Sequence, residues 1–344
     1  MQVEITPYWN GLLDAFPECA QDVYFTEEYV KLYEDGDNRA VCFVCKDGGK
    51  TMLFPFLSRT FEYQGVAYKD FETAYGYGGP VCNCDDGAFL GAALRAFKDY
   101  CQANGYVAGF VRFHPLLQNQ VGFDCIGRVL AERKTVAIDL TSPMDEVWLN
   151  EIHSKNRNMI RKAEKAGCSF HVDERFEHLQ EFVNLYDTTM DRLSAEGFYY
   201  FDATYYHKLV EGVRNTFLGY VTNGEGRIIS AAIFMYRGQY GHYHLSGSDR
   251  AEKDLSPNNF MLWNAACEMW TRGVKRFHLG GGTNSDEENS LFKFKKRFSK
   301  GTCQFYIGKL VFNETIYEGL CRDWERNNPD KAEQYRHHLL RYKY

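Results

Sequence analysis

AVCFVCKDGGKTMLFPFL, residues 40–57, and FLGYVTNGEGRIISAAIFMY, residues 217–236, have the same layout, in which a Gly-containing turn joins two apolar runs. This pattern is typical of a β-hairpin. Each hairpin is followed further along the chain by an amphipathic helix, one Gly and a short strand. These segments are Leu94–Asn104, Gly105 and Tyr106–His114 after the first hairpin, and Phe260–Arg272, Gly273 and Val274–Leu279 after the second. The repeat predicts two related α/β units.

The predicted fold class is therefore α/β (α+β), with two tandem domains of mixed sheet flanked by helices and a cleft between them. A chain of 344 residues has room for two cores of ordinary size. Thr141-Ser142-Pro143 marks a boundary, which gives a first domain at 1–140 and a second at 141–302. We expect the tail, 303–344, to pack back on the first domain. A cleft between two domains is where a ligand site usually forms.

The net charge of −6 argues against a general nucleic-acid-binding surface and against a DNA partner, so any site for a polyanion must be local. Eleven scattered cysteines, an odd number, indicate reduced thiols in a cytoplasmic protein. The start of the chain does not resemble a signal peptide. No apolar run is long enough to predict a transmembrane segment.

No metal site is predicted. Cys42 and Cys45 fall inside a predicted strand, where neighbouring side chains diverge, and Cys82 and Cys84 do not complete a zinc pattern. In the strand Tyr240–Asp249, alternate residues, among them His242 and His244, share one polar face. Two histidines two residues apart are weak evidence for zinc, and half-buried histidines with satisfied hydrogen bonds are the simpler interpretation.

The segment Ser285–Phe298 predicts a helix, because Ser285 and Glu288 have the spacing of a capping box. On a helical projection Leu291, Phe294 and Phe298 form the apolar face, and Lys295 falls at its edge. Either the lysine stem packs there while the ammonium reaches water, or the ammonium points into a cleft to meet an anionic ligand.

Three further segments are candidates for contact with a ligand. Gly280–Gly282 allow close approach of a ligand to the backbone, or simply a tight turn from strand to helix. A helix predicted over Met144–Ala166 exposes a basic face that includes Arg157 and Arg161; it is either a solvated surface or a contact for phosphates. In the loop Tyr75–Pro80, Tyr75 and Tyr77 are candidates to line a pocket.

These segments, in this order, resemble the Fem-type acyltransferases, which include the peptidoglycan-bridge aminoacyltransferases and related GNAT-like N-acyltransferases. The matching stretches are YGYGGP at 75–80, HSKNR at 153–157, IRKAEKAG at 160–167, HYHLSGSD at 242–249, LSPNN at 255–259, HLGGG at 278–282 and LFKFKKRFS at 291–299. The resemblance spans residues 24–312 and implies two GNAT-like domains.

The resemblance implies transfer of an aminoacyl or acyl group to an amine, most directly that of a cell-wall peptidoglycan precursor. It implies no tightly bound cofactor; the donor substrate is aminoacyl-tRNA or acyl-CoA. Lys295 matches the lysine of the family's Phe-Lys motif, which stabilises charge at the reacting ester, and Phe294 matches its neighbour. His244 is a candidate base. Peripheral contact with a lipid-linked precursor is also implied.

The implied substrate contacts come from several segments. They are Arg192, Tyr199, Tyr200, Tyr75, Tyr77, Ser248, Asn258, Asn259 and Phe294. Asn258 is equally interpretable as a helix cap. Arg157 and Arg161 are the implied contacts to donor phosphates or RNA.

The sequence departs from the family in two places. Asn83 follows the Gly-Pro of the first loop where bridge-forming members tend to carry an acid, and the usual coenzyme A loop is absent. Two alternatives therefore stay open. One is an acyl-CoA-dependent N-acyltransferase acting on an amino sugar or another cell-envelope amine. The other is a binding module that keeps the fold without catalysis.

Overall fold

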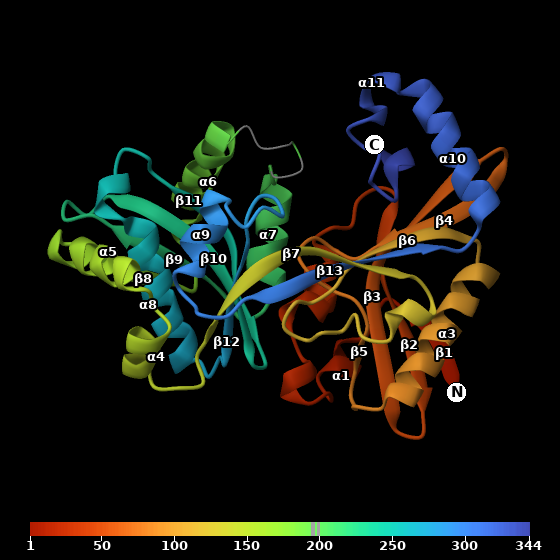
Figure 1. Ribbon diagram of the computed structural model, residues 1–344, viewed down its shortest axis with the longest axis horizontal. Coiled ribbons are helices and arrows are strands. Elements are labelled where there is room, and N and C mark those ends of the chain that lie inside the picture. The colour runs from red at the N-terminus through yellow and green to blue at the C-terminus, as the bar shows by residue number, and fades with distance from the viewer. Residues whose placement is uncertain (194–196, 198–199) are drawn as a thin grey trace. The chain divides into compact units, whose positions relative to one another are not determined.

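The computed structural model describes residues 1–193, 197 and 200–344, which form two compact units (Figure 1). Unit 1 comprises Met1–Glu132 and Gln304–Tyr344, and unit 2 comprises Arg133–Cys303. The division falls inside β7 (Arg128–Asp139) rather than after residue 140, because Thr135–Asp139 pair with β12 (Arg276–Gly281) of unit 2.

Unit 1 is a mixed sheet with helices. Its strands follow the order β1 (Gln2–Thr6), β2 (Asn38–Asp47), β3 (Lys50–Tyr63), β4 (Val66–Glu72), β6 (Tyr106–Arg112) and β13 (Cys303–Val311), with β5 (Val81–Cys82) paired to β3. Its helices are α1 (Asn10–Leu13), α2 (Glu27–Lys31), α3 (Gly87–Ala103), α10 (Glu314–Asn327) and α11 (Pro329–Ala332). Phenylalanines of β3 and α3, such as Phe54 and Phe97, form the centre of its core.

Unit 2 is built in the same way. Its strands follow the order β7, β12, β11 (Tyr240–Ser248), β10 (Ile228–Arg237), β9 (Thr216–Thr222) and β8 (Ser169–Asp173). Its helices are α4 (Met144–Asn150), α5 (Ser154–Lys165), α6 (Leu179–Leu193), α7 (Ala203–Gly212), α8 (Pro257–Thr271) and α9 (Ser290–Lys296). Helices α5 and α8 pack on each other and share one core with the sheet, whereas α6 packs against β10 and β11.

The predicted duplication is present in the strand pairing as well as in the order of elements. In unit 1, the β2–β3 hairpin is followed by antiparallel β4, then α3, then β6 parallel to β4. In unit 2, the β9–β10 hairpin is followed by antiparallel β11, then α8, then β12 parallel to β11. The first turn needs its glycines, because Gly48 and Gly49 both have positive φ. The predicted α/β class with two related halves is confirmed.

The single helix predicted over Met144–Ala166 is wrong, because the chain breaks it into α4 and α5. His153 is extended, and its Nδ1 accepts a hydrogen bond from Lys155 N at 3.1 Å, which caps α5. Side-chain capping of this kind satisfies an N–H at the helix start. The buried residues of α5 are Asn156, Ile160 and Ala163, whereas Met159 is exposed.

Gly247 of β11 offers a test of the packing of α6 on the sheet. A Cβ at this position would lie 2.3 Å from the backbone carbon of Leu185, so Gly247→Ala must push α6 away. We expect this variant to lose at least about 2 kcal/mol of unfolding free energy, as overpacked substitutions do. Gly36→Ala, where a Cβ meets nothing within 4 Å, is the matched control. Denaturant midpoints of both variants measure the difference; equal midpoints contradict the prediction.

Candidate functional site

The helix that carries Lys295 begins later than the capping box predicts. The cap of α9 is Asn289, whose Oδ1 accepts hydrogen bonds from Leu291 N at 3.0 Å and Phe292 N at 3.2 Å. Glu288 is instead paired with Lys293. The predicted start at Ser285 is therefore wrong; Asn caps a helix as well as Ser does, and α9 begins after the later residue.

The later start changes which side of the helix is buried. Phe292, Lys295 and Phe298 face the interior, and Leu291, predicted on the apolar face, is 38% exposed. Lys295 is only 8% exposed, so it lies within the buried face rather than at its edge. Phe294 is half-buried and packs edge-on against Phe298. The interpretation in which the Lys295 ammonium reaches open water is therefore wrong.

The ammonium of Lys295 meets the glycine turn that precedes α9. Its Nζ donates a hydrogen bond to the Gly281 carbonyl at 3.0 Å and lies 5.8 Å from the centre of the Tyr243 ring. Gly280 has a φ of +76°, and a Cβ there would lie 3.3 Å from Nζ. Glycine at this position therefore supplies both the backbone conformation and the room for the lysine. Tyr243 is a neighbour of Lys295 that the sequence did not indicate.

Burial lowers the pKa of Lys295 from its ordinary value of 10.5 to about 8. A lysine has three N–H donors, and Gly281 accepts one of them. A buried cation with further donors can stabilise a developing oxyanion, and its environment of low polarity strengthens that effect. This arrangement is the strongest candidate for a reactive centre in unit 2.

His244 lies at an irregularity of β11. Tyr243 pairs with Phe234 and Leu245 with Ile233, so His244 is an extra residue and the predicted alternation of the strand is broken here. Its Nε2 is 2.8 Å from the hydroxyl of Tyr205. Burial, with a smaller effect of His242, lowers the pKa of His244 to about 3. An imidazole with so low a pKa is a poor proton acceptor at neutral pH.

Three predicted substrate contacts belong to a polar network inside unit 2. The Asn258 side chain accepts from Ser230 Oγ at 2.6 Å and donates to Ser248 Oγ at 3.2 Å. Asn259 donates to the Asn156 side chain at 3.0 Å, which ties α8 to α5. Asn258 is not a helix cap, because α8 begins at Pro257 with no side-chain cap. These amides hold α8 in place, and any substrate contact would compete with those bonds.

The other predicted contacts are dispersed. Tyr75 and Tyr77 lie in unit 1, where the rings of Tyr24 and Tyr77 are 5.3 Å apart and the Tyr29 hydroxyl donates to the Tyr75 carbonyl. Arg192 is exposed at the end of α6.

Tyr200 is partly exposed and donates a hydrogen bond to Asp191 at 2.8 Å. Tyr199 lies outside the described residues. Arg157 donates from one Nη atom to the carbonyls of Trp148, Leu149 and Ile152, so it closes the end of α4. Arg161 is exposed, with its guanidinium 5.4 Å from the Trp148 ring centre.

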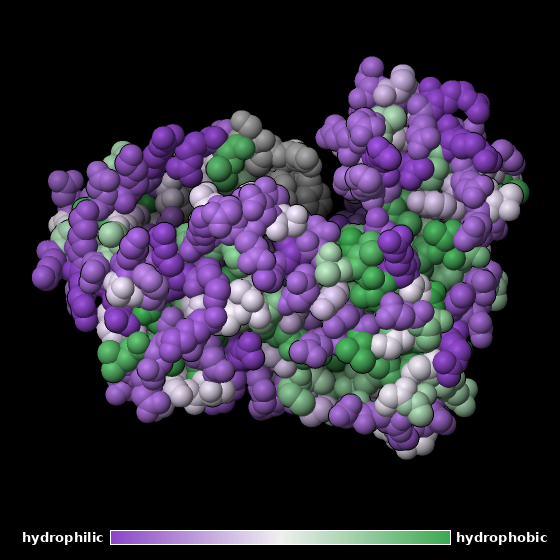
Figure 2. Space-filling view, viewed as in Figure 1, coloured by the Kyte–Doolittle hydropathy of each residue, from purple (hydrophilic) through white to green (hydrophobic). Residues whose placement is uncertain are grey.

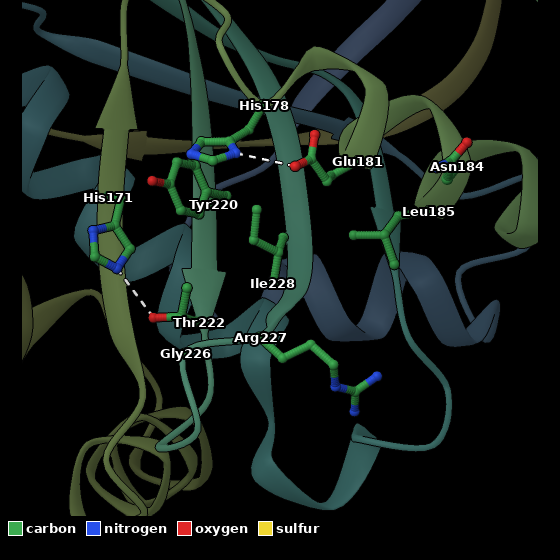
Figure 3. Close-up of a pocket in the computed structure, with 10 residues that line it drawn as sticks. All are labelled: His171, His178, Glu181, Asn184, Leu185, Tyr220, Thr222, Gly226, Arg227 and Ile228. Atoms are coloured by element: carbon green, nitrogen blue, oxygen red, sulfur yellow. Dashed lines mark hydrogen bonds and ion pairs between the residues drawn. The ribbon is translucent and has the colours of Figure 1, made fainter.

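A surface pocket of about 640 Å³ lies between the start of α6 and the ends of β8, β9 and β10 (Figure 3). Tyr220 is stacked on His171, with ring centres 4.8 Å apart, and meets His178 edge-on. His178 is paired with Glu181, and His171 with Thr222. Its histidines thus have partners within the pocket, and none of the predicted site residues lines it.

The cysteines considered as zinc ligands are structural. Burial raises the pKa of the Cys42 and Cys45 thiols, and raises that of Cys82 to about 12. In the part of the chain that the structure describes, no cysteine belongs to a group of three or more converging metal-ligand side chains. Protonated, buried thiols do not favour metal binding.

Comparisons with known proteins agree with this geometry. Residues 153–296, which contain α5, the glycine turn and Lys295, match the acetyltransferase (GNAT) domain family. A UDP-N-acetylmuramoylpentapeptide-lysine N(6)-alanyltransferase from Weissella viridescens is 24% identical, over 74% of this chain and 80% of that protein. These matches confirm the resemblance to the Fem-type acyltransferases and indicate an acyltransferase.

Solved structures share the fold. The crystal structure of FemX matches with a TM-score of 0.70 and 16% identity, over 92% of this chain and 99% of that one. L-PGS from Bacillus licheniformis matches with a TM-score of 0.54 and 16% identity, over 83% of this chain and 87% of that one. The described helices include none long and apolar enough to cross a membrane.

The lowered pKa of Lys295 predicts a pH-dependent stability difference. Between pH 8 and 10.5 the unfolded chain holds this proton and the folded chain does not, so the folded protein gains stability as pH rises through that window. Lys295→Met removes the dependence. We expect the stability of the variant relative to the natural protein to fall by about 3 kcal/mol from pH 7 to pH 10.5.

Denaturant unfolding at several pH values measures this difference. Lys293→Met is the control, because Lys293 is exposed on the same helix. A difference between Lys295→Met and the natural protein that stays constant with pH would rule out a depressed pKa.

Proposed function

We propose that this chain transfers an aminoacyl or acyl group from an ester or thioester to an amine, with Lys295 stabilising the oxyanion. The observation that carries the proposal is the buried Lys295 ammonium, held 3.0 Å from the Gly281 carbonyl with donors left for a ligand. The GNAT domain match and the similarity to the alanyltransferase support the reaction class.

The proposed reaction forms an oxyanion and releases one proton, and the site must accommodate both. The amine nitrogen attacks the carbonyl carbon, the carbonyl oxygen becomes negative, and the bond to the leaving oxygen or sulfur then breaks. The amine loses one proton. Each well-placed donor to the oxyanion is worth about 3–4 kcal/mol. Lys295 supplies such a donor together with a positive charge.

The proton that leaves the amine needs an acceptor, and the pKa of His244, about 3, makes it a weak choice. We propose that water or a substrate phosphate takes this proton. His244 and Tyr205 then act as a hydrogen-bonded pair that fixes α7 on β11. On this account His244→Gln slows transfer much less than Lys295→Met does.

The proposed acceptor is a lysine-type amine of a cell-wall peptidoglycan precursor. The Weissella viridescens relative is named for adding alanine to such a lysine, and it aligns over 74% of this chain. Arg192, exposed on α6, Tyr200 and Ser248 are the proposed contacts from unit 2. Tyr75 and Tyr77 are the proposed contacts from unit 1. The reaction is placed in the cytoplasm, where both kinds of activated donor are made.

The proposed donor is an aminoacyl-tRNA. The sequence lacks the usual coenzyme A loop, and α5 carries a basic surface next to α9. The second candidate is an acyl-CoA-dependent N-acyltransferase acting on an amino sugar or another envelope amine. The match of residues 153–296 to the acetyltransferase (GNAT) domain family supports this alternative.

Single-turnover transfer tests both the reaction and the donor. The full chain is mixed with alanyl-tRNA or acetyl-CoA and with a lysine-containing precursor, and amide formation is followed. Lys295→Met should slow transfer at least a hundredfold, about 3 kcal/mol, without loss of folding. Lys293→Met, on the exposed side of α9, should change it less than threefold.

The pH dependence separates a charge effect from a packing effect. The advantage of the natural protein over Lys295→Met should shrink as pH rises through about 8, because neutral lysine no longer offers a cation. Equal rates for Lys295→Met and Lys293→Met would exclude the proposed role. Transfer from acetyl-CoA alone would select the alternative donor.

A further inference from the structure

The geometry points to a second ligand site in unit 2, in which the pocket between α6 and strands β8, β9 and β10 binds a neutral pyranose ring of a saccharide. The pocket has a volume of about 640 Å³, within the range of sites that hold small molecules. Figure 3 shows Tyr220 and His171 on its strand side and Leu185 on its α6 side, with Ile228 between them. The described residues that line it include none of those proposed for transfer.

The pocket lies away from Lys295 within unit 2. In the sheet, β11 and β10 separate β12, which ends at Gly281, from β9, which carries Tyr220. The saccharide proposed here is therefore additional to the groups that react at Lys295. The inference goes beyond the proposed transfer and does not depend on it.

A partly exposed aromatic ring forms one wall of the pocket. Tyr220 is opposite His171 in the pairing of β9 with β8, and their rings stack with centres 4.8 Å apart and planes at 18°. His178 meets Tyr220 edge-on, with ring centres also 4.8 Å apart. These two contacts restrict the Tyr220 side chain to one orientation. A ring fixed in this way is a flat surface on which the C–H groups of a sugar can pack.

The facing surface is aliphatic and small. Leu185 of α6 and Ile228 of β10 are partly buried and line the pocket. On the face of unit 2 drawn in Figure 2, hydrophilic residues predominate and hydrophobic ones occur in small groups, unlike the broad apolar patch of a protein-binding surface. A pyranose fits the pocket better than a protein partner does, because C–H groups cover both faces of its ring and hydroxyls surround its edge.

Polar groups at the edge of the pocket supply both donors and acceptors. The Asn184 side-chain oxygen accepts from Gln180 at 3.1 Å, which leaves the amide N–H groups for a ligand. Burial, with smaller effects of nearby carboxylates, raises the pKa of Tyr220, so its hydroxyl keeps its proton at neutral pH and can donate. The Glu181 carboxylate can accept. Sugar hydroxyls both donate and accept, so they match such mixed partners.

The charged groups of the pocket are already paired, which favours a neutral ligand. Arg227 donates to Asp249 at 2.7 Å and also pairs with Glu252, so an anion would compete with two carboxylates. Glu181 is 3.2 Å from the His178 ring nitrogen and 50% exposed. A cation would therefore gain little there over its interaction with water.

Saturation-transfer NMR on the full chain tests the site with four probes. Chitotriose and cellotriose are neutral saccharides, glucosamine trimer carries ammonium groups, and adenosine is a planar aromatic ligand. We expect a neutral saccharide to bind saturably and more tightly than the other two probes. Its Kd should be on the order of 1 mM, because one ring contact and a few hydrogen bonds hold it.

Variants of the pocket locate the binding. Tyr220→Ala removes the aromatic wall and should weaken saccharide binding about tenfold. Tyr220→Phe keeps the ring and loses one hydroxyl, so binding should weaken about threefold. Asn184→Trp fills the pocket from an exposed position of α6 and should abolish binding. The matched control is Tyr8→Ala, because Tyr8 is a 74% exposed tyrosine of unit 1.

Three results overturn the inference. They are no saturable binding of either neutral saccharide to the natural protein, tighter binding of glucosamine trimer or adenosine, and equal effects of Tyr220→Ala and Tyr8→Ala. Thermal melting checks folding. If Tyr220→Ala does not fold, full binding by Asn184→Trp overturns the inference instead. Transfer by Tyr220→Phe should equal that of the natural protein, so rejection of this site leaves the proposed function standing.

Discussion

The burial of one ammonium group, that of Lys295, is the constraint on which the rest of the site depends. A lysine in the interior is unfavourable unless its charge is solvated by the protein, and here the Gly281 carbonyl and the Tyr243 ring do so. The carbonyl is available because Gly280 turns the backbone with a positive φ. Asn289 then sets the start of α9, and with it the direction in which Lys295 points. The turn at Gly280, the cap at Asn289 and the strand that carries Tyr243 must all form before the Lys295 ammonium can be held in this way.

The duplicated topology explains why this constraint falls where it does. In both units a strand parallel to its neighbour follows a long helix, as β6 follows α3 and β12 follows α8. Only β12 runs into three consecutive glycines, Gly280–Gly282, and then into a capped helix. The corresponding end of β6 leads to His114 and Pro115 instead. The two units thus share a scaffold, and the local sequence after one strand gives unit 2 its buried lysine.

Much of this could be predicted from the sequence, because hairpin turns and helix periodicity are local signals. Both hairpins and the helices after them form as predicted, with boundaries shifted by a few residues. Two of the failures share one cause, which is competition between equally good local signals. Asn289 replaced Ser285 as a cap, and His153 divided a continuous helical pattern by capping with its ring. The contact between Lys295 and Tyr243 joins distant segments, and no local pattern indicates it. The substrate residues remain predictions, since they depend on ligands.

Unit 2 contains both a buried positive charge, Lys295, and exposed positive charges on α5. Lys295 is buried, which lowers its pKa, and a carbonyl accepts one of its hydrogen bonds; the proposed role leaves its other donors for an anion formed during reaction. The lysines of α5 stay fully hydrated and carry no ion pair with the described residues, which favours long-range attraction of an anion before reaction. Arg157, which also lies on α5, does neither, because it donates hydrogen bonds to three carbonyls at the end of α4. Hydrated charge suits attraction of an anion and desolvated charge suits stabilisation of an oxyanion, so the basic residues of α5 and α9 are suited to different proposed tasks.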